Sequence, residues 1–205
     1  KDDGGDQCSD PNDSQTFAHT GFWWAESGID IRYQSLFEPD AVSGTAFAAL
    51  ERAFTTWELA VGNAELVAFA EDVGAPLPPE LDDANVVGWR QLVGKDSRRV
   101  LAVTYTWFDD TSGEVLESDI VYNTSQKWAV NAAIDAGSTA CGQDFDVQAI
   151  GTHEIGHLLG LDHVGDADAT MYGSAAKGEL RKQTLAPGDV AGAMAVVPSA
   201  PVATN

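Results

Sequence analysis

The sequence has few basic residues, few histidines and two cysteines, and it contains no long apolar run. Its 11 lysines and arginines stand against 32 aspartates and glutamates, which gives a formal net charge of −21. Such a charge repels the phosphates of nucleic acids and of anionic lipids, so both classes of partner are excluded. No run approaches the roughly 18 apolar residues that a membrane span requires, and no charged-then-apolar signal peptide opens the chain. We therefore expect an already processed form with no membrane partner.

The rest of the composition is that of a globular chain. With 205 residues, of which 44% are hydrophobic, the chain is long enough for one or two domains and can bury a real core. A highly solvated surface is the simplest explanation of the acidity, and a preference for cationic substrates is the alternative. Calcium is a third explanation, because acidic clusters could supply oxygen ligands at residues 2–3, 109–110 and 166–168. None of these clusters has the spacing of an EF-hand loop.

Three of the four histidines lie in one segment of 11 residues, from residue 153 to residue 163. It reads His-Glu-Ile-Gly-His-Leu-Leu-Gly-Leu-Asp-His. If this segment is helical, His153 and His157 lie one turn apart on one face, which is the spacing needed to chelate one metal ion. Glu154 is offset from them by about 100°, so it is not a third ligand but can reach a metal-bound water. The pattern predicts metal-dependent hydrolysis.

The end of the segment strengthens this prediction. Gly160 can adopt the left-handed conformation that ends a helix, and the resulting turn returns His163 to the same metal. With 20 glycines and 4 histidines in the chain, the chance that both fall at the correct positions is about 0.002. The alternative is a core helix whose histidines are only hydrogen-bonded, and these odds disfavour it. We predict His153, His157 and His163 as metal ligands.

The segment and its surroundings resemble the metzincin zinc endopeptidases. The pattern His-Glu-x-x-His-x-x-Gly-x-x-His, followed by Ala-Thr-Met-Tyr-Gly at residues 169–173, is similar to the metzincin signature with its Met-turn. Three flanking segments resemble the matrixin branch, of the bacterial or archaeal type, namely residues 53–57, residues 117–123 with Trp128, and residues 185–192. The resemblance runs from about residue 22 to residue 198.

The resemblance implies a fold of the α+β class, with α/β-like features. We expect a metzincin catalytic domain with a twisted, mixed five-stranded sheet, an antiparallel edge strand, about three helices and a small C-terminal subdomain. The whole chain, residues 1–205, is then a single metalloprotease catalytic domain. Its expected parts are an N-terminal arm (1–20), an upper subdomain (21–160), and a lower subdomain (161–205) with the Met-turn and a final helix.

Local patterning predicts the elements in this order. Alternation predicts a first strand at residues 29–33, and apolar residues at helical spacing predict a helix over 43–60 that is capped by Ser43. Further predicted strands lie at residues 65–69, 85–89, 100–108 and 114–122, the last two forming a hairpin. The resemblance adds a metal-binding helix at about 145–160 and a final helix near 187–197. It also makes 100–108 the edge strand that pairs with an extended substrate.

The resemblance further implies one catalytic Zn²⁺, bound by the three histidines, and Glu154 as the general base. Met171 is expected to pack beneath the metal as a hydrophobic base, and the wall of the pocket for the residue after the scissile bond is expected between Tyr172 and Leu185. The predicted function is zinc-dependent hydrolysis of internal peptide bonds in protein or peptide substrates, by a monomer. The alternatives are a zinc hydrolase of a non-peptide bond and a non-catalytic binding module.

The two cysteines, Cys8 and Cys141, leave three alternatives open. We expect the protein to be secreted and extracellular. In such a protein the two cysteines would most simply form a disulfide between the N-terminal segment and the loop before the metal-binding helix. They could also be free thiols. In matrixin zymogens an inhibitory cysteine binds the zinc, but the residues around Cys8 do not resemble that motif.

Overall fold

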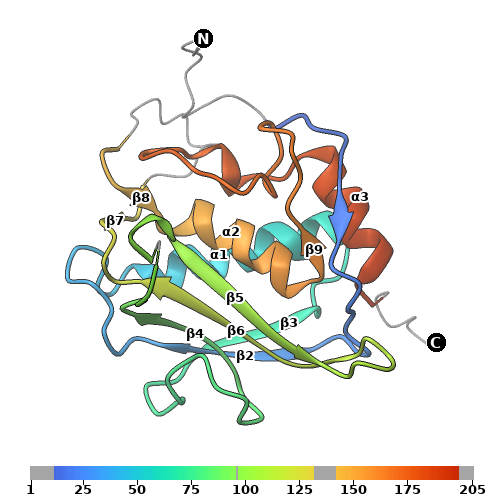
Figure 1. Cartoon of the computed structure of the whole chain (residues 1–205), viewed down its shortest axis with the longest axis horizontal. Helices are drawn as coiled ribbons and strands as arrows, with labels where there is room; N and C mark the ends of the chain where they lie inside the picture. Colours follow the sequence, from blue (N-terminus) through green and yellow to red (C-terminus); the bar gives the residue numbers. More distant parts are fainter. Residues whose placement is uncertain (1–11, 96, 132–141, 199–205) are drawn as a thin grey trace.

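A mixed five-stranded sheet, covered on one side by two helices, forms the body of the protein (Figure 1). The computed structural model describes residues 12–95, 97–131 and 142–198. The strand order is β3-β2-β4-β6-β5. Strands β2, β3, β4 and β6 are parallel, and β5 pairs with β6 in the antiparallel direction. The bounds are β2 Ile29–Gln34, β3 Val67–Glu71, β4 Asn85–Arg90, β5 Ala102–Phe108 and β6 Val115–Asn123. The predicted fold class is confirmed.

The described residues form three α-helices, α1 (Ala46–Val61), α2 (Val147–Leu158) and α3 (Pro187–Val196). Helices α1 and α2 lie side by side above the sheet (Figure 1). The indole Nε1 of Trp57 on α1 donates to the backbone carbonyl of Thr152 on α2 over 2.8 Å, which joins the two helices inside the core. The predicted apolar face of α1 is buried, because Leu50, Phe54 and Trp57 are each at most 3% exposed.

Several predicted boundaries were wrong by two or three residues, and contacts explain two of these differences. Helix α1 is capped by Thr45 and not by Ser43, because the chain turns before it: the Thr45 hydroxyl donates to the Val42 carbonyl over 2.8 Å. Strand β3 begins at Val67 rather than residue 65. Here Asn63 closes a turn, since its side-chain oxygen accepts from the Glu65 amide (3.1 Å) and its carbonyl from the Leu66 amide (3.2 Å).

Two short strand pairs lie outside the main sheet. Strand β1 (Ala18–His19) pairs with β9 (Leu161–Asp162), and β7 (Trp128–Ala129) pairs with β8 (Phe145–Asp146). The first pair brings the N-terminal arm beside the end of α2. Earlier in the arm, the Asn12 side-chain amide donates to the Thr170 hydroxyl over 2.7 Å. The described part of the arm is therefore attached to the C-terminal third of the chain.

Helix α2 is buried almost all round, so its first backbone amides need acceptors from the protein instead of water. Its cap is Asp146, which is 2% exposed. One carboxylate oxygen accepts from the Ala149 amide (2.7 Å) and the Gln183 side chain (3.0 Å), and the other accepts from the backbone and side-chain amides of Asn131 (3.0 and 3.1 Å). The cap therefore ties the start of α2 to two other segments.

We expect Asp146→Ala to lower the free energy of unfolding by about 1–3 kcal/mol, since it leaves buried donors without an acceptor. Urea unfolding followed by circular dichroism measures this. Asp146→Asn keeps one acceptor oxygen for the Ala149 amide and should lose less. Equal unfolding midpoints for the wild type and Asp146→Ala would show that the cap does not stabilise the helix.

None of the helices in the described part of the chain combines the length and apolarity needed to cross a membrane. Cys8 and Cys141 lie outside the described residues, as does the acidic pair at residues 2–3. The three alternatives for the cysteines therefore stay predictions.

Candidate metal centre

The three histidines of the motif come from α2 and from the chain that follows it. His153 and His157 lie one turn apart on α2, and His163 directly follows β9. Between them, Gly160 has a φ of 104°, the left-handed region predicted from the sequence. A Cβ at this position would meet the carbonyl oxygen of Phe22 at 2.8 Å, so both the backbone angle and the space require glycine. This turn returns His163 to the helix.

The imidazole rings converge on one point. The Nε2 atom of His163 lies 3.1 Å from that of His153 and 3.0 Å from that of His157. On the far side of two of the rings, Nδ1 of His153 lies 2.7 Å from the Thr170 carbonyl and Nδ1 of His157 lies 2.9 Å from the Leu161 carbonyl. A carbonyl only accepts, so each Nδ1 carries the proton and each Nε2 presents a lone pair.

Facing lone pairs repel each other unless a cation lies between them. The three ligand atoms all lie within 4.8 Å of one another, which suits the tetrahedral coordination of a metal such as zinc. Burial lowers the pKa of His153, His157 and His163 below the usual value for histidine. They are therefore neutral at pH 7, the protonation state that binds a metal. The donor set fits a zinc ion.

Glu154 lies on the wall of the cavity that contains the three histidines. Its side chain is 5% exposed, and burial raises its pKa to about 7 although a hydrogen bond from Thr104 opposes the shift. The Thr104 hydroxyl, on β5, lies 2.7 Å from Oε2 of Glu154 and 3.0 Å from its backbone carbonyl. A buried carboxyl group whose pKa is near neutrality can both accept and return a proton. Sequence reasoning missed Thr104, because alternation along a strand does not show which helix faces it.

Met171 lies in the core directly against α2. It is 1% exposed, and a Cβ at Gly156 would overlap its sulfur atom, so the glycine makes room for it. Asp189 stabilises the turn that contains Thr170 and Met171, because its carboxylate accepts from the backbone amides of Thr170 (2.9 Å) and Met171 (3.3 Å). Asp189 therefore fixes the position of Thr170, whose backbone carbonyl orients His153.

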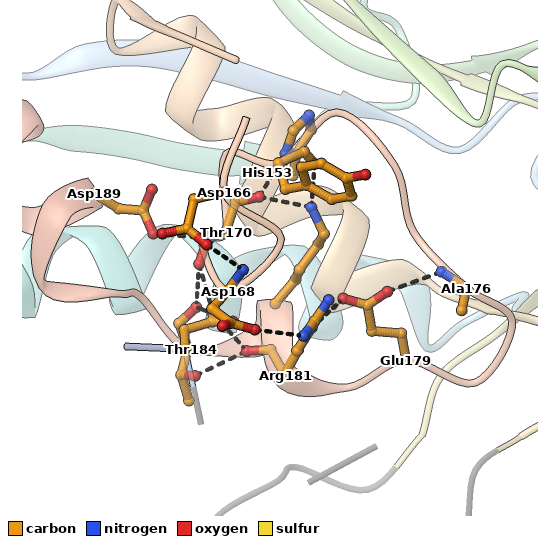
Figure 2. Close-up of polar contacts among 12 residues, drawn as sticks. His153, Asp166, Asp168, Thr170, Ala176, Glu179, Arg181, Thr184 and Asp189 are labelled. Carbon is orange, nitrogen blue, oxygen red and sulfur yellow. Dashed lines mark hydrogen bonds and ion pairs between the residues drawn. The ribbon is translucent and has the colours of Figure 1, made fainter. Parts of the chain in front are cut away.

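Figure 2 shows a polar network below the metal centre, around Thr170. Lys182 donates from Nζ to the carbonyl of Thr170 (2.8 Å) and to that of Tyr172. Arg181 donates from Nε to Glu179 over 2.8 Å and forms an ion pair with Asp168 at 3.4 Å. Sequence reasoning missed both basic residues, because lysine and arginine in a loop are usually solvent-exposed.

The network also reaches the residue that follows the cavity-lining segment 172–175. The second carboxylate oxygen of Glu179 accepts from the backbone amide of Ala176 over 2.8 Å (Figure 2). Since Glu179 also binds Arg181, the segment after Tyr172 is attached to the network below the metal centre. Burial lowers the pKa of Lys182 to about 8, so its ammonium group is still mostly protonated at pH 7.

The cavity has a volume of about 610 Å³. One side is formed by the chain from Arg99 to Thr106, which includes much of β5, and the other by α2 and by residues 172–175. Strand β5 ends the sheet, so its outer edge carries no strand among the described residues. The predicted antiparallel edge strand therefore lies along the cavity.

The acidic clusters in the described part of the chain have other partners. Asp109 accepts from the amides of Thr111 (2.9 Å) and Ser112 (2.8 Å), and Asp166 accepts from the amide of Asp168 (3.1 Å). Within the described ranges, the histidine triad is the one group of three or more histidine, cysteine or acidic side chains arranged to hold a metal. Calcium binding stays a prediction.

Comparison with known proteins agrees with this geometry. The family model described as Matrixin matches residues 23–196. Metalloendoproteinase 1 of Glycine max is 35% identical over 71 residues, which are 35% of this chain and 22% of that protein. Metalloendoproteinase 1-MMP of Arabidopsis thaliana is 35% identical over 72 residues, which are 35% of this chain and 19% of that protein. Matrilysin of Felis catus is 31% identical over 78 residues, which are 38% of this chain and 26% of that protein. The matched stretch spans about a fifth to a quarter of the length of these three proteins.

Proposed function

Because this chain belongs to the matrixin family, we propose that it is a zinc-dependent endopeptidase that hydrolyses internal peptide bonds of extended polypeptides. One observation carries the proposal: three imidazole Nε2 atoms converge beside a buried carboxyl group, in a cavity along the edge of β5 that pairs with no strand of the described residues. Each part has a role in peptide hydrolysis, and the roles follow from the contacts described above.

His153, His157 and His163 would hold the zinc through Nε2. The carbonyls of Thr170 and Leu161 accept from Nδ1 of His153 and His157 and so fix the orientation of these two rings. A zinc ion bound there supplies a Lewis acid that polarises the substrate carbonyl and lowers the pKa of a coordinated water toward about 7. Met171 supports the site by packing beneath α2.

Glu154 is the general base in this proposal. Thr104 holds Oε2 over 2.7 Å, which leaves Oε1 to take the proton of the attacking water. The same oxygen then delivers that proton to the nitrogen of the leaving amine. Burial of the carboxyl group excludes bulk water that would otherwise compete for the proton.

The outer edge of β5 is proposed to bind the substrate. An extended peptide can add to such an edge through main-chain hydrogen bonds, which recognise the backbone whatever the side chains are. This mode suits polypeptide substrates and would place a peptide carbonyl in the cavity beside the three histidines. Side-chain selection would then depend on the rest of the cavity wall.

We also propose properties that the family resemblance supports. The protein would act outside the cell as a monomer, and residues 1–205 would form one catalytic domain with the three parts expected from the sequence. We propose the bacterial or archaeal type of matrixin. Animal matrixins carry a second, structural zinc on further histidines, whereas the fourth histidine here, His19, lies 3.1 Å through Nε2 from the Gly192 carbonyl.

The proposed function predicts that the zinc-loaded protein cleaves denatured casein internally and that a zinc chelator abolishes this cleavage. Readdition of zinc should restore it, with one zinc per chain by elemental analysis. New N-termini identified by mass spectrometry would map the cleavage sites. If casein stays intact while zinc is bound, or if cleavage persists after the zinc is removed, the proposal is wrong.

A further inference from the structure

Lys182 is a buried cation on the wall of the cavity that contains the metal centre. The residue is 1% exposed, yet it lines the same cavity as His153 and Glu154. Charged side chains are rarely buried to this extent unless they pair with an opposite charge, because the loss of hydration is costly. The counter-charge of Lys182 therefore needs an explanation.

The protein does not supply this counter-charge as an ion pair within its described residues. The ion pairs there join Arg32 to Asp30 and Arg181 to Glu179 and Asp168. Among the nearby carboxylates, Glu179 and Asp189 stabilise the positive charge of Lys182 most. Both are engaged elsewhere, Glu179 by Arg181 and Ala176 and Asp189 by backbone amides.

Two backbone carbonyls, those of Thr170 and Tyr172, accept hydrogen bonds from the ammonium group. An ammonium group has three N–H donors, so one donor stays without an acceptor in the described part of the chain. Because Lys182 lines the cavity, a molecule in the cavity can supply that acceptor.

The position of the ammonium group indicates which part of a substrate would reach it. The Thr170 carbonyl binds both Nδ1 of His153 and Nζ of Lys182, so the ammonium group is two hydrogen bonds away from a proposed metal ligand. Lys182 also belongs to the stretch from Tyr172 to Leu185 that is expected to wall the pocket for the residue after the scissile bond.

The remaining wall of the cavity includes the side chains of Phe145, Ile150 and Ala175. These apolar groups can pack against the methylene groups of a substrate side chain, while Lys182 binds a carboxylate at its end. A lysine or arginine side chain of the substrate would instead bring a second positive charge close to the buried ammonium group of Lys182. Electrostatic repulsion would exclude such a side chain from this part of the cavity.

We propose, building on the proposed endopeptidase function, that Lys182 selects a substrate with an acidic side chain at the residue after the scissile bond. The recognised chemistry is a carboxylate beside the metal centre. The free carboxylate at the end of a peptide chain has the same chemistry, so the test must separate the two sources.

The test uses peptides built on a cleavage site mapped in casein, amidated at the C-terminus, that differ only in having Glu, Gln or Leu after the scissile bond. The wild type should cleave the Glu peptide with a kcat/KM about tenfold or more above that of the Gln peptide, as expected for a charge-assisted hydrogen bond. Lys182→Met should reduce this ratio to about one. Lys95→Met is the matched control, because Lys95 is exposed and does not line the cavity, and it should keep the wild-type ratio.

A purely structural role of Lys182 would lower the cleavage of all three peptides alike and leave the Glu to Gln ratio intact, which would overturn the proposal. A wild type without preference for Glu would overturn it too, and this measurement stands even if Lys182→Met fails to fold. Free-acid peptides that end at the residue after the scissile bond test the other source of a carboxylate. If these are cleaved faster than the amidated Glu peptide, the side-chain assignment is wrong.

Failure of the endopeptidase function itself would be recognised separately, because casein and all the peptides would stay intact. In that case calorimetry with the metal-loaded protein and amidated peptides that begin with Glu or Gln still tests Lys182. Tighter binding of the Glu peptide by the wild type, lost in Lys182→Met, supports carboxylate recognition. Equal binding of the two peptides excludes it.

Discussion

Glu154→Gln is expected to lower kcat/KM for peptide hydrolysis by about 10³- to 10⁴-fold while one zinc ion per chain stays bound. Glutamine has the size of glutamate, and its side-chain oxygen can still accept from the Thr104 hydroxyl, which lies 2.7 Å from Oε2 of Glu154. It cannot take a proton from water. The three histidines keep their contacts, so the variant separates proton transfer from metal binding.

Progress curves with a fluorogenic peptide and elemental analysis of the same samples measure both quantities. Glu51→Gln is a matched control, because Glu51 is an exposed residue of α1. This variant should cleave the peptide as the wild type does. If Glu154→Gln retains wild-type kcat/KM, another group must be the general base. If it loses zinc as well, Glu154 contributes to metal binding and the division of roles proposed here is wrong.

His163→Ala is expected to weaken zinc binding more than about 100-fold, since even outer-shell partners of metal ligands contribute 10- to 100-fold. Its Nε2 lies 3.1 and 3.0 Å from those of the other two histidines, so its removal opens one of the three ligand positions. His153 and His157 remain, and two ligands from one helix do not complete a tetrahedral site. Peptide cleavage should be lost together with the zinc.

Competition with a chromophoric chelator measures the zinc affinity. His19→Ala is the control, because Nε2 of His19 lies 3.1 Å from the Gly192 carbonyl, outside the metal centre, and its zinc affinity should equal that of the wild type. If His163→Ala binds zinc as tightly as the wild type, the third ligand is another group. Circular dichroism of the zinc-free proteins shows whether a loss of fold explains the result.

Much of the fold could be predicted because the responsible interactions are local. The hairpin of β5 and β6 follows from alternation around a short turn, and α1 follows from apolar residues at helical spacing. The errors are local as well. At Ser43 and at residue 65 the turn that precedes the element involves side-chain contacts, at Thr45 and Asn63, which propensity does not resolve.

Other parts could not be predicted because they join residues far apart in the chain. The pairing of β1 with β9 connects Ala18 to Asp162, and no pattern at either end indicates its partner. The hydrogen bond between Thr104 and Glu154 crosses from the sheet to α2. Each of these contacts exists only once the sheet and the helices have packed together.

The segment from residue 153 to residue 163 predicts the three histidines proposed as metal ligands and the glutamate beside them, because helical periodicity and one glycine turn bring them together within 11 residues. The surroundings of these residues depend on the folded chain. The fold brings Thr104 to the carboxyl group of Glu154, and it buries Lys182 in the cavity wall with two carbonyls and no ionic partner among the described residues. Helical spacing is set by the backbone alone, whereas burial and charge pairing depend on segments that are far apart in the sequence and meet only when the chain folds.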